Sequence, residues 1–284
     1  MEKQFPRTTV AGISLPRMLI GTNWFCGYSH RSDAADTLIK QRFSDVQAFY
    51  PVFDAFLSHG VDAVMGLLDC NPTLYQAIML AQEKSGKKIH IIDTPGINVD
   101  DNPAARREAE ATIKRSAAFG AEFCLIHHSS AEQLVNKNRK TMDRLSDYTQ
   151  MIREAGMIPG LSAHMPELVL YSDLNNYDIE TYIQLYNCMG FLMQVEVEYI
   201  SKVIHNAKKP VMTIKPFAAG RCTPYVGLNF NYNTLRECDM VTVGVSSRME
   251  ALEDIEIGMA AIERRFPDLE GRTSPVKNQD AFGN

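Results

Sequence analysis

The chain has 284 residues and a net charge of −5, with 45% hydrophobic and 22% charged residues. These shares are those of an average globular protein and exclude a disordered chain, while the acidic balance offers no basic surface to nucleic acid or an anionic membrane. No apolar run reaches the ~18 residues of a membrane span, and residues 1–9 lack the apolar stretch of a secretory signal. We therefore expect a cytoplasmic protein that acts on a small molecule, with no nucleic-acid or membrane partner.

The cysteines support the same location. The chain has six of them, and none forms a CxxC pair. Such scattered cysteines in a long chain indicate reduced thiols rather than a disulfide framework or a zinc knuckle. Cys26, Cys70, Cys188 and Cys222 fall just after predicted strand ends, where we expect small buried side chains rather than nucleophiles.

The chain alternates between short apolar runs that end in a polar residue and helix-like stretches. This alternation predicts parallel βαβ units, and eight such units close into a single (β/α)8 TIM barrel, a fold of ~250 residues. One domain then spans residues 1–284, with a hairpin at about 8–16 and a surface tail at about 268–284. The eight predicted strands are residues 18–25, 62–69, 88–93, 122–128, 157–164, 181–187, 210–215 and 240–246.

Helix signals separate most of these strands. Residues 32–59 form a long helical stretch, of one helix or two, which Gly60 ends. Asn71 caps the next helix, with Pro72 in its first turn, and Ser130 caps a long amphipathic helix that ends at Gly156. The remaining predicted helices are residues 103–118, a short helix after Pro166, 191–206 and 249–266.

Barrel enzymes place their chemistry where the strand ends meet, so the polar strand ends are the candidate site. Side chains alternate between the two faces of a strand. In the last strand the valines suit the helix layer, which turns Thr242 and Ser246 inward. The same reasoning turns His164 inward, and it allows only one of the adjacent His127 and His128 to face the barrel.

Two carboxylates, Asp69 and Asp93, end neighbouring predicted strands. At a common mouth they could share a proton or bind a divalent cation, whereas the simpler alternative is that each caps the following helix or loop. Imidazole with carboxylate suits zinc, iron or manganese, although no HxH or HExxH spacing marks such a site here. The candidate metal ligands are Asp69, Asp93, His128 and His164.

Lys215 ends the seventh predicted strand, directly before Pro216. A desolvated lysine can become a nucleophile or a base. The alternatives are a salt bridge to a carboxylate and a cationic anchor for an anionic substrate.

The loops after the last two strands combine small residues, hydroxyls, a helix N-terminus and two arginines. These features make an anion site, and phosphate sites in barrels favour these two loops. The alternative is helix capping by Ser247 with solvated arginines. The residues concerned are Gly220, Arg221, Ser246, Ser247 and Arg248.

The loop after the first strand carries an aromatic and polar rim. Aromatic side chains beside amides suit a sugar or a flat ring, and a packed lid over the barrel is the alternative. The rim residues are Asn23, Trp24, Phe25, Tyr28 and His30.

From the fourth strand onward, a little over half the chain resembles the aldo-keto reductase superfamily. The resemblance lies in Leu125-Ile126-His127, in residues 160–167, in residues 184–187, in residues 210–220 and in residues 243–248 with Glu253-Asp254 beyond. It implies a (β/α)8 barrel and an NADPH groove. In that groove Ser162 and Gln184 would hold the nicotinamide carboxamide. The phosphates would lie along Gly220, Arg221, Ser246, Ser247 and Arg248.

The chain departs from that family in its catalytic tetrad of Asp, Tyr, Lys and His. Asp69 and His127 match two members, but Asp93-Thr94-Pro95 stands where the lysine is expected, and Tyr75 comes one residue late on a helix turn. A tyrosine without its lysine is a poor acid at neutral pH, and hydride transfer needs an acid for the alkoxide.

We therefore expect an enzyme on a reductase-like scaffold that performs acid–base or metal-assisted chemistry of lyase, isomerase or hydrolase type on a small polar, sugar-like substrate. The alternatives are an NADPH-dependent oxidoreductase with a rearranged tetrad and a non-catalytic ligand-binding barrel. The cofactor stays open between NADPH and a divalent metal, and so does the oligomeric state. The predicted catalytic residues are Asp69, Asp93, His127, His164 and Lys215.

Overall fold

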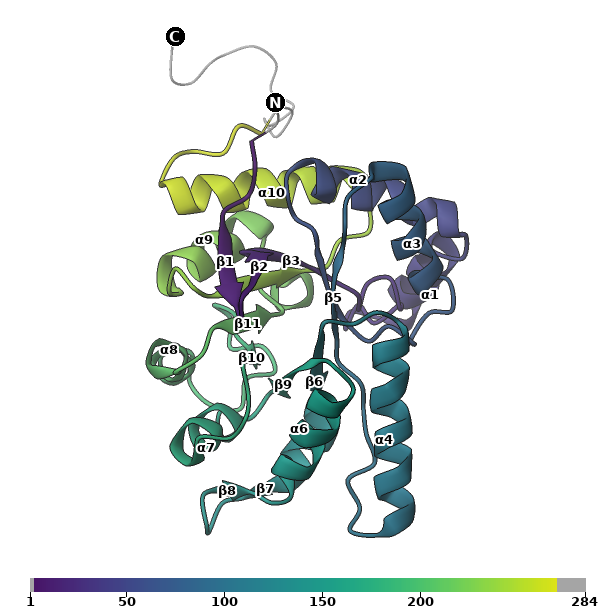
Figure 1. Ribbon diagram of the computed structural model, residues 1–284. Helices are drawn as coiled ribbons and strands as arrows, with labels where there is room; N and C mark the ends of the chain where they lie inside the picture. Colours follow the sequence, from purple (N-terminus) through teal and green to yellow (C-terminus); the bar gives the residue numbers. More distant parts are fainter. Residues whose placement is uncertain (1–2, 270–284) are drawn as a thin grey trace, which may run out of the picture.

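A computed structural model describes residues 3–269 of the chain. Eight parallel strands form a closed barrel, and the last strand pairs with the first through Val241 and Met18. Helices surround the strands (Figure 1). The predicted (β/α)8 TIM barrel is confirmed, and the predicted tail at about 268–284 lies almost entirely outside the described residues. The barrel strands are β3 (Met18–Gly21), β4 (Ala63–Gly66), β5 (His90–Asp93), β6 (Phe123–Ile126), β9 (Ile158–Ala163), β10 (Thr181–Leu185), β11 (Val211–Ile214) and β12 (Met240–Val243).

The barrel interior is a packed apolar core. Inward-facing side chains from the strands form one buried cluster, which also takes in Val10 and Leu15. These two residues come from an antiparallel hairpin of β1 (Arg7–Val10) and β2 (Ile13–Pro16), which precedes the first barrel strand. Both side chains are fully buried. The hairpin therefore packs against the interior of the barrel and adds apolar side chains to its core. The cluster members from the strands are Leu19, Ala63, Met65, Ile92, Phe123, Leu125, Ile183, Met212 and Met240.

The two caps expected from the sequence, Asn71 and Ser130, do not begin their helices, because Thr73 precedes α3 and Ser130 lies inside α5. Other side chains cap the longest helices. Asn102 caps α4 by accepting hydrogen bonds from the N–H groups of Ala104 and Ala105, and Ser247 caps α10 by accepting from the N–H of Glu250. Such caps satisfy the free N–H groups of a first turn. The helices are α1 (Asp33–Arg42), α2 (Tyr50–Ser58), α3 (Leu74–Ser85), α4 (Pro103–Ala118), α5 (His128–Ala131), α6 (Leu145–Glu154), α7 (Glu167–Asn175), α8 (Val197–Asn206), α9 (Pro224–Thr234) and α10 (Arg248–Glu263), with short 3-10 turns η1 (Val46–Phe49), η2 (Glu132–Leu134) and η3 (Ala218–Gly220).

The structure differs from the prediction between residues 130 and 156. One long amphipathic helix was expected there, but α5 and η2 are followed by a hairpin of β7 (Val135–Asn136) and β8 (Thr141–Met142) before α6 begins. The hairpin turn contains Lys140 with a φ of 51°, a left-handed backbone that a helix cannot continue through. The hairpin extends beyond α6 at the bottom of Figure 1.

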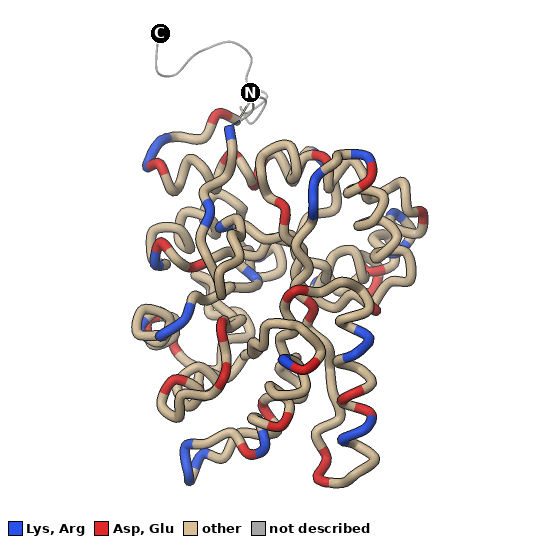
Figure 2. The backbone as a smooth tube through the Cα atoms, in the orientation of Figure 1, with Lys and Arg blue, Asp and Glu red and all other residues tan. Residues whose placement is uncertain are grey.

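The barrel strands are also shorter than predicted. Seven of the eight strands end one to four positions before the predicted end, and only β5 ends at the predicted residue, Asp93. Most of the polar residues that follow the apolar runs therefore lie in loops, where the strand alternation no longer applies. Charged residues lie mainly on the helices and loops around the barrel (Figure 2). None of the helices between residues 3 and 269 is both long and apolar enough to cross a membrane.

A disulfide joins two loops at the end of the barrel that carries the candidate site. Cys26, after β3, and Cys70, after β4, are bonded, with their Cα atoms 5.6 Å apart. The expectation that all six cysteines are reduced is therefore wrong for this pair. Although 44 positions separate the two residues, β3 and β4 are neighbours in the barrel and bring their loops together. The four free cysteines are Cys124, Cys188, Cys222 and Cys238.

Candidate active site

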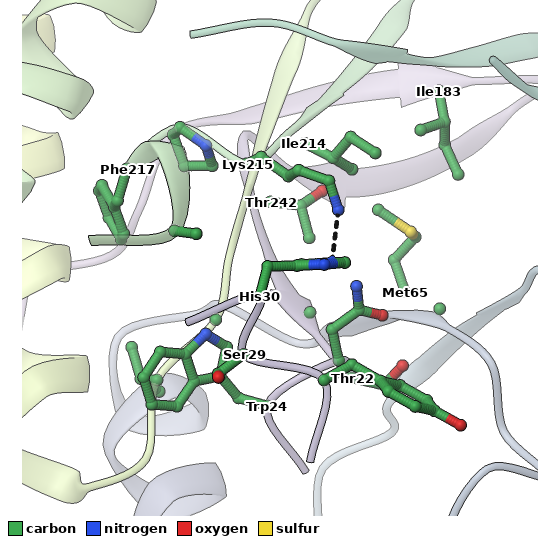
Figure 3. Close-up of a pocket in the computed structure, with 18 of the residues that line it drawn as sticks. Thr22, Trp24, Ser29, His30, Met65, Ile183, Ile214, Lys215, Phe217 and Thr242 are labelled. Atoms are coloured by element: carbon green, nitrogen blue, oxygen red, sulfur yellow. Dashed lines mark hydrogen bonds between the residues drawn. The ribbon is translucent and has the colours of Figure 1, made fainter. Parts of the chain in front are cut away.

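A cavity of about 550 Å³ opens among the loops that follow the carboxyl ends of the strands. Its volume suits a small ligand. Apolar side chains of Met65, Ile183 and Ile214 lie around the tip of Lys215, and Trp24 forms another part of the wall (Figure 3). The cavity wall thus combines apolar side chains with polar and charged residues.

The most direct polar contact in the cavity joins Lys215 and His30. Lys215 Nζ lies 2.8 Å from His30 Nε2 (Figure 3). Burial lowers the pKa of Lys215 to about 8, and burial together with the neighbouring Lys215 charge also lowers the pKa of His30. The imidazole is therefore neutral at neutral pH, and its nitrogen accepts a hydrogen bond from the amine.

No carboxylate within residues 3–269 lies at ion-pair distance from Lys215. The salt bridge that sequence reasoning weighed as an alternative does not form there. A buried amine without a counter-ion favours its neutral form, and the neutral form is the nucleophilic one.

Both His127 and His128 line the cavity, together with His164. The expectation that only one of the adjacent pair could face the barrel is wrong, because β6 ends at Ile126 and the two residues belong to the start of α5. The ring centroids of His128 and His164 are 3.8 Å apart with nearly parallel planes, and those of His127 and His128 are 4.2 Å apart. Three imidazoles therefore form one cluster on a wall of the cavity.

The three imidazoles are neutral at neutral pH. Burial, with His128 and Lys215 nearby, lowers the pKa of His127 to about 4 and that of His164 to about 3. Burial also lowers the pKa of His128, although Glu132 acts in the opposite direction. Nδ1 of His127 lies 2.8 Å from the Ser129 hydroxyl and 3.4 Å from the Ser129 N–H. In the tautomer whose Nδ1 accepts both hydrogen bonds, the ring proton is on Nε2. His127 can therefore offer an N–H to an oxygen atom in the cavity.

Glu132 fixes the loop that carries His164. Its Oε1 accepts hydrogen bonds from the backbone N–H groups of His164 and Met165, at 2.8 and 2.9 Å. Its other carboxylate oxygen lies 4.0 Å from Nδ1 of His128. Sequence reasoning did not select Glu132, because its helical turn was predicted to continue into a long helix rather than to return beside β9.

Asp69 and Asp93, predicted for the mouth, lie outside the cavity lining. Asp69 follows the end of β4 by three residues, and its half-exposed side chain pairs with Arg115 at 3.6 Å. Asp93 is buried against the helix layer, where it accepts hydrogen bonds from the Ser116 hydroxyl and the Leu68 N–H. Burial raises the pKa of Asp93 to about 6. The structure does not bring the two aspartates together with His128 and His164.

The residues predicted to hold a nicotinamide lie in two different settings. Ser162 lines the cavity, whereas Gln184 is fully buried beside it and its amide nitrogen donates to the carbonyl of His164. Tyr75, the tyrosine nearest to the reductase pattern, packs against Phe119 in the helix layer. Of these three side chains, only that of Ser162 is positioned to contact a ligand in the cavity.

A carboxylate already occupies the predicted anion site before α10. Glu250 accepts hydrogen bonds from both the N–H and the hydroxyl of Ser246, while Ser247 caps the helix. Arg248 is exposed. In the other loop Gly220 lines the cavity, but the Arg221 guanidinium donates to the carbonyl of Ala218 and stacks over Phe191. A phosphate at the N-terminus of α10 would meet the negative charge of Glu250.

Two threonine hydroxyls in the cavity wall are buried without a hydrogen-bond partner among the described residues. They belong to Thr22, after β3, and Thr242, in β12. A buried hydroxyl without a partner costs free energy, so both favour a polar ligand. The alternation in the last strand correctly turned Thr242 inward. His30 was predicted only as part of the rim after the first strand, and Glu132 and Glu250 were not selected, because each lies in a loop or short helical turn where no strand pattern applies.

Comparison with known proteins places the fold. No family model matches the chain, and no curated protein sequence does. Among solved structures, an assigned aldo-keto reductase of Pseudomonas aeruginosa is similar with a TM-score of 0.68 and 10% identity, covering 92% of this chain and 98% of that one. The glycerol dehydrogenase of Gluconobacter oxydans is similar with a TM-score of 0.60 and 12% identity over 94% and 98% of the two chains. At these identities the expected resemblance to the aldo-keto reductases is a likeness of barrel fold alone.

Proposed function

We propose that this protein is an enzyme that performs lyase- or isomerase-type acid–base chemistry on a small, polar carbonyl compound, with Lys215 forming an imine to the substrate. The observation that carries the proposal is the 2.8 Å contact between Lys215 Nζ and His30 Nε2 inside the cavity, without a carboxylate partner for the lysine in residues 3–269.

The amine has the properties that imine formation requires. With its pKa lowered to about 8, about a quarter of Lys215 is neutral at pH 7.5. The neutral amine adds to the carbonyl carbon, and the oxygen takes up a proton to give a carbinolamine. Loss of water then gives a protonated imine, which makes an adjacent C–H or C–C bond easier to break because the electron pair moves to nitrogen.

Histidines supply the proton transfers on either side of the amine. His30 accepts the proton that Lys215 loses before it attacks, because the two nitrogens already share a hydrogen bond. The protonated His30 then returns this proton to the substrate oxygen as the carbinolamine forms, and His127, on the cavity wall, only hydrogen-bonds that oxygen through its ring N–H. The hydroxyls of Thr22, Thr242 and Ser162 favour a substrate that bears hydroxyl groups, such as a sugar-like compound.

Exchange of the hydrogen next to a substrate carbonyl tests this proposal. In D₂O the wild-type protein is expected to accelerate deuterium incorporation into members of a panel of small hydroxyaldehydes and hydroxyketones, as followed by NMR. Lys215→Met is expected to lose this acceleration, whereas Lys137→Met, at an exposed lysine, keeps it. Equal exchange with wild type and Lys215→Met argues against the proposal. A ligand that binds without exchange favours the non-catalytic barrel.

An NADPH-dependent reductase is the second candidate, because Ser162 faces the cavity on a barrel of reductase type. The residues present do not fit the cofactor phosphates as they stand, since the Glu250 carboxylate holds the N-terminus of α10 and the Arg221 side chain is already engaged. The chain has a single tryptophan, Trp24, which lies in the cavity wall. Quenching of its fluorescence by micromolar NADPH supports this candidate, and an unchanged signal removes it.

A further inference from the structure

We propose that His128, Glu132 and His164 form a binding site for a divalent transition-metal ion on the wall of the cavity. One possible ligand atom from each of these residues lies within 4.8 Å of the other two. The site goes beyond the imine chemistry of Lys215 and does not depend on it, since metal binding is measured without any substrate.

The spacing of the three groups is close to that of a metal site. Ligands bound to zinc at 2.0–2.1 Å in a tetrahedron lie about 3.4 Å from one another. The Nδ1 of His128 and the free carboxylate oxygen of Glu132 are 4.0 Å apart. Since all three ligand atoms lie within 4.8 Å of one another, each pair needs to approach by at most about 1.4 Å. Such a movement is within the reach of side-chain rotation.

The carboxylate is held in place by the same loop that carries one of the histidines. Because Glu132 Oε1 accepts from the N–H groups of His164 and Met165, the other oxygen stays directed toward His128. Outer hydrogen bonds of this kind orient the ligands in metal sites. The Glu132 carboxylate is thus preorganised as a ligand, and the short helical segment from His128 to Glu132 keeps His128 beside it.

The imidazoles need only to turn. The rings of His128 and His164 are stacked with an angle of 16° between their planes, so their nitrogens lie side by side rather than converging. Rotation about the bond between Cβ and the ring is a soft motion, and it directs one nitrogen of each ring toward the same point. Both residues line the cavity, which leaves the remaining coordination positions open to water or a ligand.

The ligand types select the class of metal. Two imidazoles and one carboxylate suit zinc, cobalt or ferrous iron, and they disfavour magnesium and calcium, which prefer oxygen ligands. Three protein ligands with an open position are typical of a catalytic rather than a structural metal site. The two aspartates considered from the sequence, Asp69 and Asp93, take no part in it.

Titration of untagged, chelator-treated full-length protein with Co²⁺ and Zn²⁺ tests the site. We expect one Co²⁺ per chain, with a visible absorption band of low-symmetry cobalt, displacement by Zn²⁺, and no displacement by Mg²⁺. His164→Ala and Glu132→Gln should each weaken Zn²⁺ binding at least tenfold. The Glu132→Gln amide oxygen can still accept the two backbone hydrogen bonds, which keeps the loop in place.

Two controls separate this site from others. His205→Ala removes an exposed histidine on α8 and should leave the affinity unchanged. Cys222→Ser tests the thiols of Cys188 and Cys222, which contact each other after β10 and β11, and it should also leave the affinity unchanged. Binding that His164→Ala and Glu132→Gln do not weaken, or that Cys222→Ser abolishes, overturns the proposal, as does the absence of stoichiometric binding.

Discussion

Lys215 and His30 both adopt left-handed backbone conformations, with φ angles of 60° and 56°, and their side chains meet at 2.8 Å. This conformation is unfavourable for a residue with a Cβ atom, and such strain is typically found where structure serves a site. Lys215 leaves β11 directly at its end, and His30 lies in the loop after β3. The two strained residues therefore bring together an amine and an imidazole that are 185 positions apart in the sequence.

The first prediction concerns the reactivity of Lys215. Because burial lowers its pKa to about 8, its modification by a small amine-reactive reagent should show a midpoint near pH 8. Peptide mass spectrometry across a pH series measures the modification. Lys137 is the control, because its hydrogen bond to Glu167 raises its pKa above the usual value. If modification of Lys215 shows the same dependence on pH as modification of Lys137, the Lys215 amine is not in an environment that lowers its pKa.

The second prediction concerns stability at Lys215. Folding lowers the pKa of Lys215 to about 8. While the lysine is protonated in both the folded and the unfolded protein, its burial lowers the free energy of unfolding, and this loss becomes smaller as pH rises above about 8. Between pH 7 and 9.5, wild type should therefore gain about 2 kcal/mol of unfolding free energy relative to Lys215→Met. Urea unfolding of both proteins at the two pH values measures the difference. If the unfolding free energies of wild type and Lys215→Met change equally between the two pH values, burial of the charged amine does not destabilise the folded protein.

The third prediction concerns Asp93, which lies outside the cavity lining. Burial raises the pKa of this carboxyl to about 6. The folded protein therefore favours the protonated carboxyl, and the free energy of unfolding falls as pH rises from the unfolded pKa through about 6 and the buried group must ionise. From pH 5 to 7.5, wild type should lose about 1.4 kcal/mol more than Asp93→Asn. Denaturant unfolding at both values tests this, and Asp147→Asn, at an exposed carboxylate, is the control.

The barrel could be predicted from the sequence because apolar runs mark the buried strands and capping residues mark the helix ends, and both signals are local in the chain. It also identified Lys215, His127, His128 and His164 as residues near a common mouth, and all four line the cavity. It failed where the chain leaves the sheet. Asp69 lies three positions beyond the end of β4, so alternation could not place its side chain, and it turns to Arg115 instead.

The remaining errors arise in other ways. Asp93 ends its strand as predicted, but its carboxylate finds donors in the helix layer and not in the mouth. His30 lines the cavity from a left-handed loop position, and Glu132 lies in a short helical turn beside His128 and His164. Contacts distant in sequence determine both positions. The disulfide between Cys26 and Cys70 likewise follows from the pairing of β3 with β4, and no spacing rule indicates it.

The fourth prediction uses the single tryptophan as a reporter of the cavity wall. A Cβ atom on Gly244 would lie 2.4 Å from Cδ1 of Trp24, so Gly244→Ala must displace the indole. We expect a shifted emission maximum and weaker binding of any cavity ligand. Gly96→Ala is the matched control, because its added Cβ would have no neighbour closer than 4.0 Å. Unchanged emission in Gly244→Ala would show that Trp24 does not pack on this strand end in solution.

Reductive trapping tests the central claim most directly. The protein is incubated with small hydroxyaldehydes and hydroxyketones, reduced with borohydride, digested and mapped by mass spectrometry. We predict a stable secondary amine on Lys215 with at least one compound, at a yield well above that on exposed lysines such as Lys137, and its loss in Lys215→Met. Labelling that is absent from Lys215, or equal on Lys215 and on exposed lysines, would contradict imine chemistry in this barrel.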